Sequence, residues 1–221
     1  MEANFDNQGD LVPSELGTKE YWSTVYENEK DNFKNYGDPG EIWFGEESEE
    51  RILRWLEKKK ISKNKEIVDL GCGNGMMLVS LSRSGFTNLT GIDYCSEAVE
   101  LSKSVALSHD IHNINFKVLD LVGNLDISGF DIAFDKGTYD AISLNPENAV
   151  EKRQRYIENV SNLLNDDGLF IITTCNWTDH EIVSHCKDVF QCFEVIPTPT
   201  FQFGGKIGNV VSTLVLQKKL K

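Results

Sequence analysis

The sequence predicts an α/β protein with a doubly wound, mostly parallel seven-stranded sheet and an antiparallel strand near its C-terminal end. Between residues 67 and 174, short apolar runs alternate with helix-like segments, as in sheets whose parallel strands are joined by crossover helices. The apolar run that ends at Leu70 leads into a turn with glycine at three alternate positions. The last two strand-like runs have no helix between them, so they should pair antiparallel.

The N-terminal part of the chain is predicted to be a leader followed by a helical extension. Residues 1–15 are polar and are expected to form a flexible leader, and residues 16–221 a single domain whose first part, 16–65, is helical. Trp22, Tyr26 and Phe33 recur at helical spacing before Gly-Asp-Pro-Gly at 37–40 ends the helix. The next helix, 46–60, has acidic residues in its first turn and lysines in its last, as the helix dipole favours.

The remaining elements follow from apolar periodicity and from turn residues. The expected strands are 67–70, 89–93, 114–119, 130–135, 168–174, 192–196 and 210–217. The expected helices are 75–83, 96–108, 148–164 and 179–187, and residues 197–208 are expected to be a connection that contains proline and glycine.

Composition limits the classes of partner and of cellular setting. The formal net charge of −13 argues against nonspecific binding to nucleic acid or to an anionic membrane, because both require a basic surface. The five cysteines form no C-x-x-C pair, and an odd number fits no fully paired disulfide framework. The sequence also contains no signal peptide and no membrane-length apolar run. We therefore expect a cytoplasmic monomer with reduced thiols and a protein partner.

The glycine turn predicts a ligand close to the backbone. Gly71, Gly73 and Gly75 lack Cβ where the chain turns from a strand into a helix, so backbone N–H groups can face a nucleotide-like molecule. A dinucleotide-binding turn requires Gly or Ala at the sixth position counted from Gly71, and this position is Met76. The turn therefore argues against NAD and FAD.

Acidic residues follow successive strands of the predicted sheet. In such sheets the ligand lies beyond the carboxyl ends of the strands, so Asp93 is placed to accept ribose hydroxyls. Asp120, or the backbone amide of Leu121, is placed to read an adenine edge, and Asp69 to hold the turn or an ammonium group. Each acid could instead be a helix cap, but their joint position after consecutive strands favours a ligand site.

The fourth predicted strand carries a family signature. Residues 135–141, Asp-Lys-Gly-Thr-Tyr-Asp-Ala, resemble a motif of one branch of the seven-strand S-adenosylmethionine-dependent methyltransferases, whose members act on protein lysines. Residues 16–22, 40–46, 175–178 and 201–205 match the same branch. The resemblance runs from residue 16 to the C-terminus. It implies a Rossmann-like methyltransferase fold, S-adenosyl-L-methionine as cofactor and a protein-lysine substrate, with translation elongation factor 1-alpha as the expected partner.

The resemblance, together with the strand ends, gives a set of expected site residues. Expected cofactor contacts are Trp43, Asp69, Gly71, Gly73, Asn74, Gly75, Asp93, Tyr94, Asp120, Leu121, Asp135 and Lys136. Because only about 0.1% of an ordinary lysine is neutral at pH 7, a methyl acceptor needs a group that removes its proton or its water. Asp135, Tyr139 and Trp177 are the candidates for positioning it. The rings could instead be core packing, and Lys136 could contact the cofactor's carboxylate or face solvent.

Three alternatives to methyl transfer to a protein are a metal site, a small-molecule methyltransferase and a noncatalytic cofactor-binding protein. The histidine pairs His109/His112 and His180/His185 have no third ligand nearby in the sequence, so no metal site is expected. A small-molecule methyltransferase would share every cofactor residue, and a noncatalytic cofactor-binding protein could keep the fold. The family resemblance and the absence of a recognisable small-substrate insertion argue against the small-molecule enzyme, and the intact turn glycines and acids at the strand ends argue against the noncatalytic protein.

Overall fold

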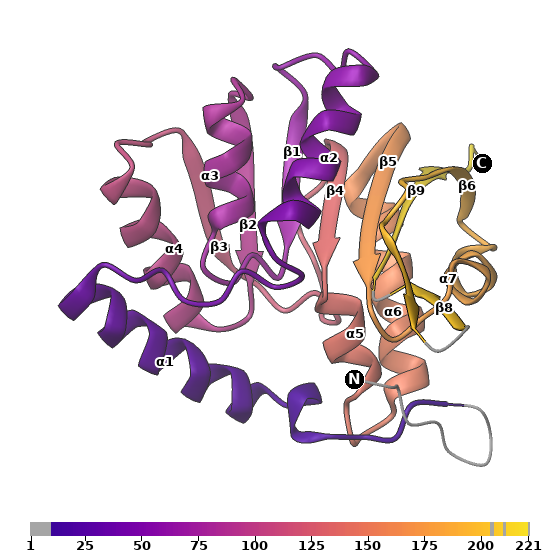
Figure 1. The fold of residues 1–221 in the computed structure, drawn as a ribbon, viewed down its shortest axis with the longest axis horizontal. Helices are drawn as coiled ribbons and strands as arrows, with labels where there is room; N and C mark the ends of the chain where they lie inside the picture. The colour runs from indigo at the N-terminus through magenta and orange to yellow at the C-terminus, as the bar shows by residue number, and fades with distance from the viewer. Residues whose placement is uncertain (1–9, 204–205, 210, 221) are drawn as a thin grey trace.

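The structure, a computed structural model, describes residues 10–203, 206–209 and 211–220 and is built on a seven-stranded sheet (Figure 1). The strand order is β3-β2-β1-β4-β5-β9-β6. Neighbouring strands from β3 to β5 are parallel, whereas β9 is antiparallel to both β5 and β6. The predicted fold class is therefore confirmed. The strands are β1 Glu66–Leu70, β2 Asn88–Asp93, β3 Ile114–Val118, β4 Phe130–Lys136, β5 Leu164–Thr174, β6 Phe190–Val195 and β9 Ser212–Lys218.

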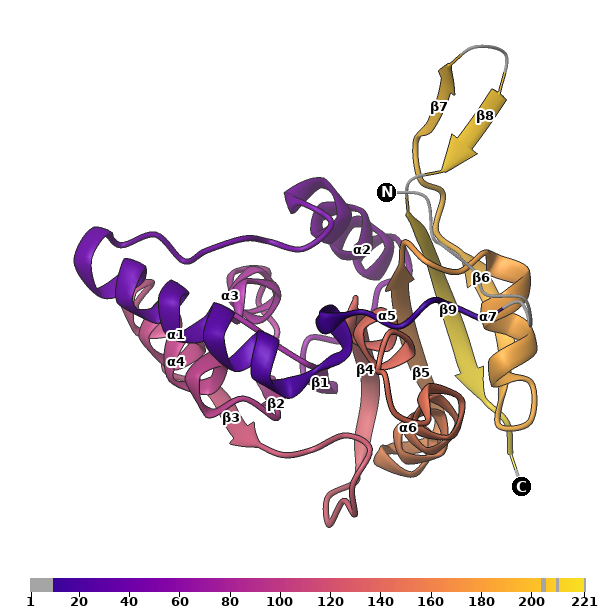
Figure 2. The ribbon, with the colours of Figure 1, turned by 90° about the horizontal axis from the view of Figure 1, so that it is seen from below.

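Helices cover both faces of this sheet. They are α1 Lys19–Tyr36, α2 Glu46–Lys58, α3 Met76–Arg83, α4 Ser96–Ser108, α5 Thr138–Ser143, α6 Ala149–Leu163 and α7 Asp179–Cys186, preceded by the 3-10 helix η1 Glu15–Gly17. The core of one face contains residues of α5, α6 and α7, and that of the other face residues of α2 and α3. Figure 2 shows α2 and α6 on opposite sides of the sheet. α1 packs with α3 and α4 in a third cluster.

The alternation of side chains along the strands explains the two cores. In β1, Val68 and Leu70 contribute to one cluster and Ile67 to the other, and all three are fully buried. Successive residues of a strand point to opposite faces, so a strand covered on both sides is apolar throughout. This is why continuous apolar runs identified the parallel strands.

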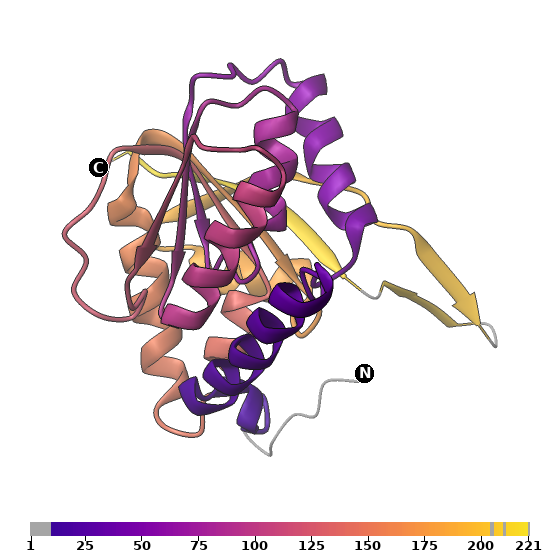
Figure 3. The same cartoon turned by 90° about the vertical axis from the view of Figure 1, so that its left-hand side faces the viewer.

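Three features differ from the sequence prediction. The six-residue α5 was not predicted, and β5 begins at Leu164, where a register shift separates the pair Phe130–Leu164 from the rest of the β4–β5 ladder. Within the expected connection 197–208, β7 Thr200–Phe203 and β8 Lys206–Asn209 form a separate antiparallel hairpin. The hairpin projects away from the body of the molecule (Figures 2 and 3).

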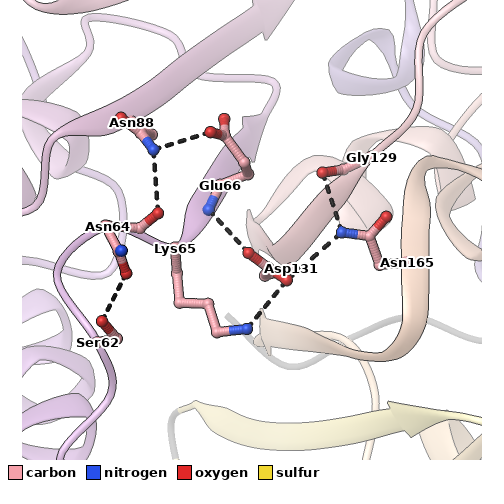
Figure 4. A network of polar contacts seen from close by, with 8 residues as sticks. All are labelled: Ser62, Asn64, Lys65, Glu66, Asn88, Gly129, Asp131 and Asn165. Carbon is pink, nitrogen blue, oxygen red and sulfur yellow. Dashed lines mark hydrogen bonds and ion pairs between the residues drawn. The ribbon is translucent and has the colours of Figure 1, made fainter.

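The edge of the sheet formed by the amino ends of β1, β2 and β4 is held by polar contacts (Figure 4). Asp131 accepts hydrogen bonds from the backbone N–H of Glu66 at 3.0 Å and from Lys65 Nζ at 3.1 Å. Asn88 Nδ2 donates to the carbonyl of Asn64 at 3.0 Å and to Glu66 Oε1 at 2.8 Å. These side chains fix where the strands begin, which leaves the carboxyl edge for a ligand.

The described part of the expected leader docks against the domain. Leu11 is buried in the core of the α5–α7 face, and the backbone N–H of Ser14 donates to the carbonyl of Leu144 at 3.0 Å. Asp10 forms a two-pronged ion pair with Arg153 of α6, at 2.8 and 3.1 Å. Residues 10–15 are thus a docked strap, which departs from the flexible leader expected there, and residues 1–9 lie outside the described residues. Over the described ranges, every helix is too short or too polar to span a bilayer.

Candidate functional site

A cavity of about 660 Å³ lies at the carboxyl edge of the parallel strands. Asp93 and Lys136, which end β2 and β4, line it together with Asp69, the penultimate residue of β1, and Asp120, which follows β3. The strap, including Leu11 and residues 12–14, lines another side. The cavity thus occupies the place where ligands bind in doubly wound sheets.

The first glycine of the turn packs against a residue of the signature motif at 135–141. Gly71 has φ +72°, and a Cβ at this position would lie 2.1 Å from Thr138 Oγ1. Thr138 Oγ1 in turn donates to the carbonyl of Leu70 at 2.6 Å. The ends of β1 and β4 are therefore locked together through a contact that only glycine allows.

The second glycine is held by the acid at the end of β2. Asp93 Oδ2 accepts from the N–H of Gly73 at 3.1 Å, and Oδ1 accepts from the N–H of Cys95 at 2.9 Å. A Cβ on Gly73 would lie 2.6 Å from the hydroxyl of Tyr26, so α1 packs directly on the turn. Burial raises the pKa of Asp93 to about 6, which favours a ligand that hydrogen-bonds to the ionised carboxylate. Gly75, which caps α3, does not line the cavity.

Asn74 connects the turn to the loop that precedes α2. Its Nδ2 donates to the carbonyls of Pro39 and Glu41, each at 3.0 Å, and its Oδ1 accepts from the N–H of Met76 at 3.2 Å. Asn74 lines the cavity, as expected, and it also fixes the chain leading to Trp43. The indole of Trp43 lines the cavity as well, so turn and loop form one continuous wall.

Lys136 lines the cavity but is engaged by protein groups. Its Nζ donates to the carbonyl of Trp43 at 3.1 Å and lies 3.5 Å from Glu49 Oε1. The Lys136 side chain is only 15% exposed, so it does not face solvent, and its contact with the cofactor's carboxylate stays a prediction. Asp69 is buried beside this pair, and desolvation raises its pKa to about 7 against the opposing effect of Lys136.

The expected adenosine-side residues also line the cavity. The Tyr94 hydroxyl donates to the carbonyl of Thr18 at 3.4 Å, and this bond joins the cavity to the start of α1. Asp120 is exposed and accepts from the N–H of Val122 at 3.0 Å, and Leu121 is buried beside it. The three residues lie beyond β2 and β3, as their sequence positions predicted.

The three expected lysine-positioning residues lie outside the cavity lining. Asp135 is 1% exposed, and its carboxylate accepts from the N–H groups of Thr138 and Tyr139 and from the Tyr156 hydroxyl at 2.6 Å. Tyr139 is equally buried, with its hydroxyl 2.9 Å from His185 Nδ1. The indole of Trp177 donates to Ser143 Oγ at 3.2 Å. Asp135 therefore stabilises the first turn of α5, and the two rings pack in the core.

Asp140 is a carboxylate of the cavity that sequence reasoning missed. It is 5% exposed and accepts from the Thr174 hydroxyl and from the N–H of Cys175 at 2.9 Å. Cys175 and Asn176, at the end of β5, line the same part of the cavity. Asp140 is the second acid of the signature motif, so the motif was the signal that could have identified it. Burial raises its pKa.

The donor set of the cavity fits an organic ligand with hydroxyl and ammonium groups. Two buried carboxylates, Asp69 and Asp93, stand beside backbone amides at a turn without side-chain bulk. In the chain segments that the structure describes, no three His, Cys, Asp or Glu side chains are grouped to hold a metal ion.

Comparison with known proteins identifies the family. Residues 61–218 match the family model described as "Methyltransferase domain". The chain is 51% identical to mouse (Mus musculus) EEF1A lysine methyltransferase 2, covering 95% of this chain and 86% of that protein. It is 37% identical to the protein-lysine N-methyltransferase EFM4 of Saccharomyces cerevisiae, covering 95% and 97%.

The fold matches solved methyltransferase structures. The N-methyltransferase NodS of Bradyrhizobium japonicum, in complex with S-adenosyl-L-homocysteine, has a TM-score of 0.67 at 13% identity. That match covers 89% of this chain and 98% of NodS, and at this identity it shows a common fold. The chain belongs to the methyltransferase domain family and, within it, to the group of protein-lysine methyltransferases that includes EEF1A lysine methyltransferase 2.

Proposed function

We propose that this protein is an S-adenosylmethionine-dependent protein-lysine N-methyltransferase whose substrate is a lysine of translation elongation factor 1-alpha. The observation that carries the proposal is that one cavity is lined by all the predicted cofactor residues except Gly75 and Asp135. The substrate is supported by relatives that are 47–51% identical and named for EEF1A.

The residues of the cavity suit the parts of this cofactor. Asp93 can accept the ribose hydroxyls, Asp120 and the amide of Leu121 can read the adenine edge, and Asp69 can pair with the ammonium group. When bound, S-adenosylmethionine supplies a methyl group on a sulfonium, an electrophile that needs no metal. The strap and Trp43 line the cavity and limit access of water, which strengthens the electrostatic interactions inside it.

The acceptor side is proposed to be the end of the cavity at β4 and β5. The lysine has to arrive as an ammonium and lose a proton before it can attack. Asp140 is the carboxylate at this end, and its raised pKa makes it a better proton acceptor than an exposed aspartate. Asp135 is proposed to support α5, which carries Asp140, and to act on the reaction only through that helix.

The charge of the chain supports a protein partner. A net charge of −13 favours a basic protein surface over nucleic acid or an anionic membrane. We propose that the protein works as a monomer in the cytoplasm.

The test is transfer of a labelled methyl group from S-adenosylmethionine to purified elongation factor 1-alpha. We expect label on one lysine with the wild-type protein and much less label with Asp93→Asn at limiting S-adenosylmethionine, while the exposed control Asp126→Asn behaves as wild type. Label in a small-molecule fraction of a cell lysate would instead support a small-molecule methyltransferase. Cofactor binding without any transfer would support a noncatalytic protein.

A further inference from the structure

Glu49 is a buried acid that the proposed chemistry does not use. It belongs to the first turn of α2, where Glu46 and Glu47 are exposed, yet Glu49 is only 3% exposed. Its Oε2 accepts a long hydrogen bond from Ser80 Oγ at 3.4 Å. Its Oε1 is buried and has no hydrogen-bond donor within the described residues. A helix dipole alone does not account for this burial, because the dipole is equally satisfied by exposed acids.

The group facing Glu49 Oε1 is the ammonium of Lys136, at 3.5 Å. Lys136 also donates to the carbonyl of Trp43, and it lines the cavity. One ammonium therefore joins α2, the loop before α2 and the end of β4. The indole of Trp43 lies edge-on to Trp22 of α1, with ring centroids 5.4 Å apart, so the same loop is also held from the other side.

The charges around Lys136 do not balance. Glu49 and Asp69 are both buried and interact with Lys136, and Asp93 is a further acid that acts on Asp69. Lys19, a cation that acts on Asp93, is not among the groups that act on Asp69 or Glu49. Burial raises the pKa of Glu49, against which Lys136 acts. A buried charge is stable only when it is paired or neutralised, so this end of the cavity favours a bound cation.

We propose that Glu49 is a positioning residue for the cofactor: it fixes Lys136, and through Lys136 the carbonyl of Trp43, at the glycine-turn end of the cavity. The proposal rests on the proposed function for the nature of the ligand. Glu49 does not line the cavity and acts only through Lys136 and Trp43. Its negative charge, together with that of Asp69, leaves an excess that the ammonium of the cofactor's amino acid part neutralises.

The test compares Glu49→Gln with the matched control Glu47→Gln, an exposed acid in the same helical turn. Affinity for S-adenosylhomocysteine is measured by calorimetry. The protein is labelled with 5-fluorotryptophan, and the fluorine resonance of Trp43 is assigned with Trp43→Phe. We expect about tenfold weaker binding for Glu49→Gln, the loss typical of one charged contact, and a shifted or broadened Trp43 resonance. The Trp177 resonance should stay in place, and Glu47→Gln should match wild type.

A second variant covers the case in which Glu49→Gln does not fold. Glu49→Gln/Lys136→Gln removes both charges, which a protein tolerates better than one unpaired buried charge. It should fold, bind S-adenosylhomocysteine about tenfold more weakly and lose the wild-type Trp43 resonance. A folded variant of either kind with wild-type affinity and a wild-type Trp43 resonance would overturn the role of Glu49 but leave the proposed function standing. Failure of the wild-type protein to bind S-adenosylhomocysteine would overturn the proposed function instead.

Discussion

Replacing Asp93 with asparagine should weaken cofactor binding and at the same time stabilise the free protein. The pKa of Asp93 rises from 3.8 to about 6 on folding. A tenfold change in the proton equilibrium corresponds to about 1.4 kcal/mol, so above pH 6 the ionised carboxylate destabilises the fold by roughly 3 kcal/mol. Asparagine removes that charge and keeps one oxygen for the N–H of Gly73 or Cys95.

The dependence on pH has a defined sign. Between pH 4 and 6 the folded wild-type protein binds more protons through Asp93 than the unfolded chain, so the contribution of Asp93 to stability falls as pH rises. The advantage of Asp93→Asn should therefore be greatest near pH 8, with a melting temperature higher by up to about 6–12 °C, and should vanish near pH 4.

The assays are thermal unfolding from pH 4 to 8 and calorimetric titration with S-adenosylhomocysteine. Loss of a charge-assisted contact should reduce affinity by about tenfold to a hundredfold. The exposed control Asp126→Asn should change neither quantity. Wild-type affinity in Asp93→Asn, or a stability difference that is the same at pH 4 and pH 8, would refute the reasoning.

Three further outcomes are expected. Gly71→Ala should lose about 2–4 kcal/mol of unfolding free energy in urea, because its Cβ would meet Thr138. Gly129 also has a positive φ, but a Cβ there would meet open space. An equal loss for Gly129→Ala would therefore contradict the role of the Thr138 contact. Near pH 7, binding of S-adenosylhomocysteine should release protons from the protein, since the pKa of Asp69 is about 7 and the ligand's ammonium favours the ionised carboxylate. Calorimetry in buffers of different ionisation enthalpy should show less proton release for Asp69→Asn. Tyr139→Phe should lose about 1 kcal/mol of stability but keep its turnover. Reduced turnover in a stably folded variant would show that Tyr139 takes part in the reaction.

The cofactor side of the site could be predicted because strand order places its residues. Asp69 and Asp93 lie at the carboxyl ends of β1 and β2, Asp120 follows β3, and the carboxyl ends of parallel strands meet at one edge. The positions of these acids relative to the predicted strands were therefore enough to predict that they lie close together. The family is likewise confirmed by the relatives that cover nearly the whole chain.

The acceptor side could not be predicted, because it depends on a helix too short to show periodicity. α5 has six residues, so its periodicity did not indicate that Asp135 would bond to its first turn, and only the signature motif could have pointed to Asp140 as a residue of the cavity. The pairing of Glu49 with Lys136 is a contact between distant segments and leaves no local pattern. The hairpin of β7 and β8 was concealed by the glycines of this segment and by the two prolines that precede it, Pro197 and Pro199.

The position of β9 determines how the sheet can be completed. β6 precedes β9 in the chain, yet among the described strands it pairs with β9, which lies between β6 and β5. The attachment of β6 to the rest of the sheet therefore depends on a segment about twenty residues further along, which must itself pair with β5. A chain cut before Ser212 would leave two open strand edges, at β5 and at β6, and unpaired edges are templates for aggregation. The same insertion means that β6 depends for its attachment to the sheet on the last strand described, so damage to that strand would release more of the domain than its seven residues.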